Sequence, residues 1–377
     1  MTIHVGLNLL WLRPGEVGGT ETYIRRIVQA VDAQSAEVEW HMFGTEKAID
    51  SVGGSNAASA AFVSPHLANT PALRVVLERT WLRQRMAVGR RGRPGLDVVH
   101  HPGGTVPFRS DTKTAVTIHD LQPLDDPTNF SAAKRAFLAR AIPTAIERAD
   151  LVLTPSMWVG EQIKERFSCD ESKIRTVSAF AESRSVAPSS TSSTQIGEIL
   201  GRGPIVLYPA MTMRHKNHAM LFRAFAQAVR ERPDLQLVCV GAVGRDDRQI
   251  REEAVAASDR IHMLGLVSGV DLNVLFETAE SLVFPSRYEG FGLPVLEAQQ
   301  CGLPVIASNA GALPEVAGDA ARLLDPADQA AWTEALCSPL QGEAHEAAIA
   351  AGVRNTARFT METSATQQLS AYAQLAT

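Results

Sequence analysis

Residues 281–297 read SLVFPSRYEGFGLPVLE. The first four form an apolar run typical of a buried strand, and a turn with two glycines follows. Pro294 then suits the first turn of a helix, because a helix start leaves its N–H groups unpaired anyway. A strand that passes through a glycine-rich turn into a helix presents backbone N–H groups to an anion, most often phosphate. The stretch therefore predicts an α/β unit with a phosphate site.

Two carboxylates flank the same turn. Glu297 follows Leu293 by four residues, about one helical turn, so it stays near the start of the predicted helix. A carboxylate there can accept hydrogen bonds from sugar hydroxyl groups, and Glu289 can reach hydroxyls on the far side of the phosphates. Taken alone, two glutamates and two glycines fit a plain strand-to-helix turn with solvated carboxylates equally well.

The alternation of short apolar runs and helical patterns extends along the whole chain. The expected strands cover residues 3–10, 38–43, 97–100, 115–118 and 151–154, then 205–208, 235–240, 262–264, 281–284 and 305–307. Between the two sets, residues 188–194 read PSSTSST, which indicates a linker or exposed loop. The pattern predicts an α/β fold with two domains, each a parallel sheet covered by helices on both faces. Thr20 is the expected N-cap of the first helix.

The composition bounds the function classes. The 377 residues are 45% hydrophobic and 20% charged, which excludes wholesale disorder and coiled coil. A formal net charge of -5 does not favour nucleic acid as a partner. No apolar stretch reaches the roughly 18–20 residues of a membrane span, and no basic region precedes the first strand as in a signal peptide. The four cysteines form no CxxC pair, so we expect reduced thiols, no zinc site and a cytoplasmic protein.

The segment from Glu289 to Glu297 resembles the E-x7-E signature of the retaining glycosyltransferases of family 4, which have the GT-B fold. Residues 284–286 and several positions between 297 and 316 continue the family pattern. The resemblance implies two Rossmann-like domains that face each other across a cleft. It implies that Glu289 contacts the transferred sugar and Glu297 the nucleotide ribose. The main-chain amides that would serve the sugar and the phosphates are those of Gly290, Phe291, Gly292 and Leu293.

A second motif, YPAMTMRHKNH at residues 208–218, follows a strand and opens a helix. In the resembling family this loop carries an arginine and a lysine, which neutralise the charge that builds on the departing diphosphate. Lys216 matches the lysine, whereas Pro209-Ala210 stand where the arginine is usual. Arg214 either takes the place of that arginine or is a solvated loop charge.

Two further positions resemble parts of the family's nucleotide pocket. Gly241 ends an expected strand and either lines the pocket or forms a plain turn. Leu266 lies in the sequence LGLV, residues 264–267, which resembles the family stretch beside the base. Backbone groups would do the reading there, so these residue types do not identify the base.

On the N-terminal side, the resemblance implies that the loop of Gly19 approaches the donor phosphates, and an ordinary turn before a helix is the alternative. His119 and Asp120 end an expected strand, where open α/β sheets bind ligands. The resemblance implies that His119 is the active-site histidine near the transferred sugar and that Asp120 is its usual neighbour. Asp120 caps the next element in the alternative interpretation. His100 ends another strand and is a weaker candidate for acceptor contact.

Residues 74–93 combine seven arginines with interleaved apolar residues. Such a segment, Arg74 to Arg93, either docks on an anionic membrane surface at the inner face of the membrane or is a solvated helix face with a basic loop. The tail at 357–372 resembles the family's closing helix, which returns to the N-terminal domain. The domain bounds that follow are 1–180 for the acceptor side, 181–203 for a linker, 204–355 for the nucleotide-sugar domain and 356–377 for the closing helix.

The resemblance implies a hexosyltransferase that takes a sugar from a nucleotide-diphospho-sugar and retains its configuration. Mannose from GDP-mannose is the first choice, and a UDP- or dTDP-sugar is the rival. The expected acceptor is a glycan, a lipid-linked acceptor or a small molecule in polysaccharide or glycoconjugate synthesis. No metal and no other cofactor are expected. A nucleotide-sugar 2-epimerase of the same fold and a catalytically silent scaffold are the alternatives, whereas the absence of GxGxxG after the first strand disfavours a dehydrogenase.

Overall fold

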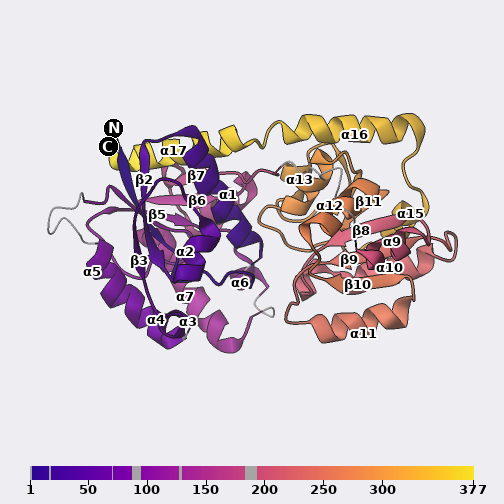
Figure 1. The fold of residues 1–377 in the computed structure, drawn as a ribbon, viewed down its shortest axis with the longest axis horizontal. Helices are drawn as coiled ribbons and strands as arrows, with labels where there is room; N and C mark the ends of the chain where they lie inside the picture. Colours follow the sequence, from indigo (N-terminus) through magenta and orange to yellow (C-terminus); the bar gives the residue numbers. More distant parts are fainter. Residues whose placement is uncertain (1, 17, 70, 87–94, 127–129, 183–192) are drawn as a thin grey trace. The chain divides into compact units, whose positions relative to one another are not determined.

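The computed structural model describes residues 2–16, 18–69, 71–86, 95–126, 130–182 and 193–377. The chain divides into two compact units, which Figure 1 shows with their helices and strands labelled. Unit 1 comprises Met1–Ala179 together with Thr360–Thr377, and unit 2 comprises Phe180–Phe359. The last helix of the chain therefore belongs to unit 1, which otherwise consists of the N-terminal half of the chain.

Among the described residues, unit 1 is built on a seven-stranded parallel sheet with the order β3-β2-β1-β4-β5-β6-β7. The strands are β1 (Ile3–Asn8), β2 (Val38–Gly44), β3 (Ala57–Phe62), β4 (Val98–His101), β5 (Lys113–Thr117), β6 (Leu151–Thr154) and β7 (Ile174–Thr176). Most residues of the central strands are buried on both faces, as a parallel sheet covered by helices requires.

The helices of unit 1 include one from the far end of the sequence. They are α1 (Gly19–Gln34), α2 (Glu46–Val52), α3 (Pro65–Asn69), α4 (Pro71–Leu77), the π-helix η1 (Glu78–Leu82), α5 (Arg83–Met86), α6 (Gln122–Asp125), α7 (Ala132–Arg148), α8 (Met157–Phe167), the short η3 (Glu171–Lys173) and α17 (Met361–Ala376). Helix α17 packs beside α1 and contacts β1, β4, β5 and β7 (Figure 1). The fully buried Tyr372 of α17 stacks edge-on against Trp40 of β2.

In the described part of unit 2, six parallel strands form a sheet with the order β10-β9-β8-β11-β12-β13. The strands are β8 (Ile205–Pro209), β9 (Gln236–Val240), β10 (Ile261–Gly265), β11 (Ser281–Phe284), β12 (Val305–Ser308) and β13 (Ala321–Leu324). One apolar core joins this sheet to its helices, and Phe222, Phe225 and Trp332 are its largest fully buried helix residues together with Phe276. The helices are α9 (Thr194–Leu200), η4 (Arg214–Lys216), α10 (His218–Ala228), α11 (Asp247–Ala257), α12 (Gly269–Thr278), α13 (Leu293–Gln300), α14 (Leu313–Ala317), α15 (Gln329–Cys337) and α16 (Gly342–Thr356).

The predicted α/β class is confirmed, and the structure also shows elements that the sequence pattern missed. Strand β3 has the sequence AASAAF, and its alanines and serine carry little strand propensity. The short β7 and β13 were not expected either. The prediction that Thr20 caps the first helix is wrong: α1 already begins at Gly19, and Gly18 occupies the N-cap with φ 60 and no side-chain cap.

The structure describes only part of the predicted linker and only part of the basic segment. Within the predicted linker at 181–203, residues Thr194–Leu200 form α9, whose Ile196 and Ile199 are buried in the core of unit 2. Residues 183–192 lie outside the described residues, as do residues 87–93 of the basic segment. Within the described ranges, none of the helices has the length and hydropathy of a membrane span.

Candidate active site

The strand order marks one place in unit 2 for a ligand. Strands β9 and β10 lie to one side of β8, whereas β12 and β13 lie beyond β11, so the order reverses between β8 and β11. Open α/β sheets bind ligands outside the carboxyl ends of their strands at such a point. The loops that leave β8 and β11 there contain Lys216 and Glu289.

Lys216 and Glu289 form an ion pair at this edge. The Nζ atom of Lys216 lies 2.6 Å from Oε1 of Glu289, and the two side chains are 17% and 12% exposed. The ammonium group also lies 5.5 Å from the centre of the Phe284 ring, at the end of β11. The buried hydroxyl of Tyr208 donates a hydrogen bond to the carbonyl of Lys216. The structure therefore fixes a positive and a negative group side by side, with little exposure to solvent.

Hydrogen bonds to backbone carbonyls join the loop after β8 to the loop after β11 and to the segment after β13. The side-chain amide of Asn217 donates to the carbonyls of Pro285, at 3.1 Å, and Pro326, at 2.8 Å. The N–H of Arg287 donates to the carbonyl of His215 at 2.8 Å. Sequence reasoning assigned no role to Asn217 and Arg287, although each lies within a motif already recognised.

Helix α13 begins where its sequence predicts. Gly292 is its N-cap, in the left-handed region with φ 103, and Pro294 lies in the first turn as expected. A Cβ atom on Gly292 would lie 2.5 Å from a methyl carbon of Leu313, so packing also favours glycine here. Phe291 is buried and stacks edge-on against Phe359 at 5.6 Å. The backbone from Gly290 to Leu293 is thus fixed by its neighbours at the helix start.

Glu297 lies in the second turn of α13, and the residue is 8% exposed. The structure places it on the helix that starts from the Glu289 loop, four residues after Leu293. Carboxylates are rarely buried to this degree without a partner. The solvated-turn alternative for the two glutamates therefore does not describe either of them.

Arg214 begins η4, and its N–H donates to the carboxylate of Asp246 at 2.9 Å. Its side chain lines a pocket of about 180 Å³ together with residues of α10, α11 and the β11 loop, among them Asn217, Asp246, Glu253 and Arg287. Arg214 and Arg287 thus border one pocket within unit 2.

The loop between β8 and η4 rests against the loop after β9. A Cβ on Gly241, where φ is 148, would lie 2.4 Å from the carbonyl oxygen of Ala210, so two backbones meet there. The hydroxyl of Thr212 accepts from the N–H of Gly244 at 2.7 Å and lies 3.0 Å from a carboxylate oxygen of Asp247. Glycine at position 241 therefore allows the two backbones to approach closely, which is a packing role. The sequence had suggested either pocket lining or a plain turn for this residue.

Leu266 follows β10 and is 76% exposed, and Val243 after the neighbouring β9 is 68% exposed. The N–H of Gly241 donates to the carbonyl of Gly265 at 2.8 Å, which joins the two loops. Both residues therefore lie at the carboxyl edge of the unit 2 sheet, after β9 and β10, which lie to one side of β8.

In unit 1 the predicted residues also lie at carboxyl ends of strands. Gly19 is the first residue of α1, and a Cβ there would meet no described atom within 4 Å, so no protein packing requires glycine at this position. Asp120 accepts a hydrogen bond from the N–H of Gln122 at 3.0 Å, at the start of α6. The N-cap of α6 is Leu121, and the helix has no side-chain cap, so the bond from Asp120 to Gln122 belongs to the turn that precedes the helix.

His119 follows β5 and is partly exposed. Its Nε2 lies 2.9 Å from the carbonyl of Pro102, and since a carbonyl only accepts, the ring proton is on Nε2. Burial lowers the pKa of His119 to about 4, and the bond to Pro102 offsets only part of this effect. The ring is therefore neutral at pH 7, with Nδ1 left as an acceptor.

His100, the weaker candidate for acceptor contact, has a structural position instead. It is fully buried, with Nδ1 2.8 Å from the hydroxyl of Tyr372 and Nε2 2.8 Å from that of Thr117. His101 is also buried, and its Nδ1 lies 3.1 Å from the side-chain nitrogen of Asn8. Neither ring has the solvent access that a substrate contact requires.

These buried rings predict acid sensitivity. Burial lowers the pKa of both His100 and His101 to about 3, whereas the unfolded chain protonates near the ordinary histidine value of 6.5. The unfolded state therefore binds more protons between these values, so the free energy of unfolding should fall as the pH falls below 6.5, by about 1.4 kcal/mol per pH unit for each histidine. Urea unfolding between pH 5 and 7.5 measures this slope.

In the variant His101→Gln, the free energy of unfolding should depend less steeply on pH than in the wild type. The control His66→Gln, which changes an exposed histidine of α3, should keep the wild-type slope. Equal slopes in the wild type and His101→Gln would contradict the assignment.

Comparisons with known proteins show the family of the chain. The model of "Glycosyltransferase Family 4" matches residues 17–182, and that of "Glycosyl transferases group 1" matches residues 203–341. The O-antigen chain mannosyltransferase B of Escherichia coli is 30% identical over 282 residues, which cover 73% of this chain and 74% of that protein. The O-antigen chain mannosyltransferase RfbU of Salmonella typhimurium is 26% identical over 262 residues, or 68% of this chain and 67% of the relative.

Among solved structures, the sucrose-phosphate synthase of Thermosynechococcus elongatus has a TM-score of 0.72 and 21% identity, with 99% of each chain covered. A likeness at this identity concerns the fold, which in both cases consists of Rossmann-like units. The two family models together cover most of both units, and the second includes the segment from Glu289 to Glu297. The chain therefore belongs to the group 1 glycosyltransferases of family 4 and has the GT-B fold.

Proposed function

We propose that this glycosyltransferase moves mannose from GDP-mannose to a glycan or lipid-linked acceptor and retains the configuration at the anomeric carbon. The observation that carries the proposal is the Lys216–Glu289 pair at the switch point of unit 2, beside the start of α13. The two relatives reported above are named as O-antigen mannosyltransferases, which supports mannose and a polysaccharide pathway. A UDP- or dTDP-sugar is the rival donor.

Each group in the site has a task in this proposal. Lys216, Arg214 and the amides at the start of α13 stabilise the negative charge that develops on the diphosphate, which is why no metal is needed. Glu289 accepts hydrogen bonds from the sugar, and Glu297 accepts them from the ribose. In unit 1, the neutral His119 offers Nδ1 to a hydroxyl group.

The transfer step follows from retention. The bond between the anomeric carbon and the diphosphate oxygen breaks, and the acceptor hydroxyl oxygen forms its bond on the same face. The acceptor proton passes to the departing diphosphate oxygen, so no protein base is required. The products are the mannosylated acceptor and GDP.

The test uses the purified full chain with GDP-mannose and an alkyl α-mannoside as the acceptor probe. NMR of the product should show an α linkage, because the donor is the α anomer. A β linkage would overturn retention. Faster transfer from UDP- or dTDP-sugars would replace the proposed donor, and a changed sugar without any acceptor would indicate an epimerase. Tight donor binding without turnover on mannosides or on glycolipid extracts would indicate a silent scaffold.

Glu297→Gln should weaken the binding of GDP-mannose by about 10- to 100-fold, since hydrogen bonds to charged groups contribute about 1.5–3 kcal/mol. The measurement is the thermal stabilisation by GDP-mannose, because a ligand that binds only the folded state raises its stability. Glu277→Gln, at an exposed position of α12, is the matched control and should bind the donor as the wild type does. Unchanged affinity in Glu297→Gln would remove Glu297 from the donor site.

We also propose that α4, η1 and α5 contact an anionic membrane surface. Leu82 and Met86 pack into the core of unit 1, but Leu73 and Val76 remain exposed on the same segment as its arginines. Val76→Ser should weaken sedimentation with phosphatidylglycerol vesicles by roughly 3- to 10-fold, because less apolar surface enters the interface. Val353→Ser, at an equally exposed position of α16, is the control. Equal binding by both variants would argue for a solvated helix face.

A further inference from the structure

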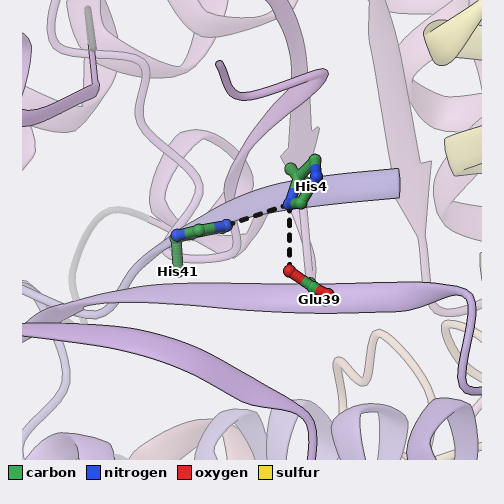
Figure 2. A group of neighbouring side chains, drawn as sticks. All are labelled: His4, Glu39 and His41. Carbon is green, nitrogen blue, oxygen red and sulfur yellow. Dashed lines mark hydrogen bonds and ion pairs between the residues drawn. The ribbon is translucent and has the colours of Figure 1, made fainter. Parts of the chain in front are cut away.

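Three side chains of metal-binding types, two histidines and a glutamate, meet on one face of the unit 1 sheet. Strands β1 and β2 are parallel, and their register pairs His4 with Glu39 and Gly6 with His41. Since residues two apart on a strand point to the same face, Glu39 and His41 share a face of β2, and His4 lies opposite Glu39. Figure 2 shows the carboxylate of Glu39 and the ring of His41 directed at His4.

The ligand atoms are close together. Nδ1 of His4 lies 3.3 Å from Nε2 of His41 and 3.2 Å from Oε2 of Glu39. All three ligand atoms lie within 4.8 Å of one another, and all three residues are partly buried. Two imidazole nitrogens and one carboxylate oxygen therefore converge on a small volume at the sheet surface.

These separations match those between the ligands of a tetrahedral metal. Ligand atoms about 2.0 to 2.1 Å from a zinc ion are about 3.3 to 3.4 Å apart along the edges of the tetrahedron. The two separations from His4, 3.3 and 3.2 Å, are those of such edges, and the third lies within 4.8 Å. An ion could thus bind with small movements of side chains that are already in place.

Neighbouring groups orient two of the ligands. The Nδ1 atom of His41 lies 2.8 Å from the hydroxyl oxygen of Ser59 on β3. When Nδ1–H donates to that hydroxyl, Nε2 keeps the lone pair that a metal requires, as in the outer shells of known metal sites. The backbone N–H of His4 donates to the carboxylate of Asp97 at 2.8 Å, which fixes the strand at the residue that carries the first ligand.

We propose that His4, Glu39 and His41 bind a divalent ion of the zinc type. Two imidazoles and one carboxylate suit Zn²⁺, whereas Mg²⁺ and Ca²⁺ prefer sites made of oxygen ligands. Three protein ligands leave the fourth position to water. The ion would link β1 to β2, and through Ser59 its ligands reach β3.

This site is separate from the proposed transfer reaction. His4 and Glu39 are each the second residue of their strand, so the cluster lies toward the amino-terminal ends of β1 and β2. Substrates of open α/β sheets bind at the opposite, carboxyl ends. The proposed ion therefore stabilises unit 1 and takes no part in the transfer of the sugar.

The test is calorimetric titration of the tag-free, chelator-treated full chain with zinc sulfate. We expect one equivalent to bind, and we expect Glu39→Gln and His4→Gln each to weaken the affinity at least about tenfold, as the loss of even an outer-shell partner can do. The side chain of Glu39 is 42% exposed, so the substitution leaves the core intact. Asp50→Asn in α2 removes the same charge, and His66→Gln in α3 removes a surface histidine; both should bind zinc like the wild type.

A second readout follows the folded protein itself. Zinc should raise the thermal stability of the wild type and leave that of Glu39→Gln unchanged. Millimolar Mg²⁺ should not displace the zinc from the wild type. Failure of the wild type to bind one equivalent, or equal affinity in the wild type and both ligand variants, would overturn the proposal. The cluster would then be a histidine–glutamate pair that shares a proton. Because transfer from GDP-mannose is measured separately, this result would leave the proposed function untouched.

Discussion

Lys216→Met should lower kcat by about 10²- to 10³-fold, which is the loss typical of removing one group that stabilises developing negative charge. The lysine is the cation that the structure holds at the switch point, 2.6 Å from Glu289. Methionine keeps most of the length of the side chain but removes the ammonium group, and with it the contact of that group with the Phe284 ring. The measurement is steady-state transfer from GDP-mannose, with kcat and KM determined separately.

The ion pair itself supplies the control for this prediction. Lys216→Met leaves the largely buried carboxylate of Glu289 without its ammonium partner, which should destabilise the protein by up to about 3 kcal/mol. The double variant Lys216→Met with Glu289→Gln removes both charges and should recover most of that stability without recovering activity. Lys164→Met in α8 breaks a partly exposed ion pair with Glu171, far less buried than the pair of Lys216, and should leave kcat unchanged and stability within about 1 kcal/mol of the wild type. A folded Lys216→Met protein with kcat within about threefold of the wild type would exclude the proposed role.

Gly311→Ala should destabilise unit 2 by at least about 3 kcal/mol, because a new contact with backbone cannot be relieved by a side-chain rotation. Gly311 has φ 63, and a Cβ atom there would lie 2.6 Å from the carbonyl oxygen and 2.8 Å from the nitrogen of Glu289. The neighbouring N–H of Ala312 donates to that same carbonyl at 3.0 Å. The substitution must therefore displace the backbone of Glu289, and activity should fall together with stability.

Gly342→Ala separates the effect of the positive φ from the effect of the contact with backbone. Gly342 also has a positive φ, 52, but no atom of another described residue beyond its chain neighbours lies within 4 Å of its would-be Cβ. Its substitution should cost only the conformational penalty of about 1–2 kcal/mol. Urea unfolding combined with hydrogen exchange over residues 281–317 compares the two variants. If both lose the same stability, the close approach of Gly311 to Glu289 has no energetic consequence.

The residues of the candidate site in unit 2 could be predicted because they lie in continuous segments. The strand, turn and helix around Glu289 follow from local pattern, and Pro294 indicates where α13 begins. The resemblance then supplied roles that local pattern could not. What the sequence could not show is which group each charge would meet, as with Lys216 and Glu289, because 73 residues separate them.

Other features depended on the register between strands, which no single segment reveals. Glu39 and His41 alternate on one strand in a way that predicts a shared face, but their partner His4 is found only when β1 and β2 are paired. Strand β3 escaped notice because alanine and serine are poor strand formers, and its neighbours on the sheet decide its conformation. Asp120 had two equally good interpretations, and its bond to the N–H of Gln122 forms in the turn before α6, where Leu121 is the N-cap.

The membership of α17 in unit 1 sets an order of events during synthesis. The ribosome makes nearly all of unit 1 first, then all of unit 2, and only at the end the residues of α17. Until that helix emerges, Trp40 and His100 lack Tyr372, and the carbonyl of Ser178 lacks the hydroxyl of Ser364. Domains usually complete their folding as they leave the ribosome. Here the unit made first must wait, with part of its core uncovered, while the unit made second already has its whole sequence.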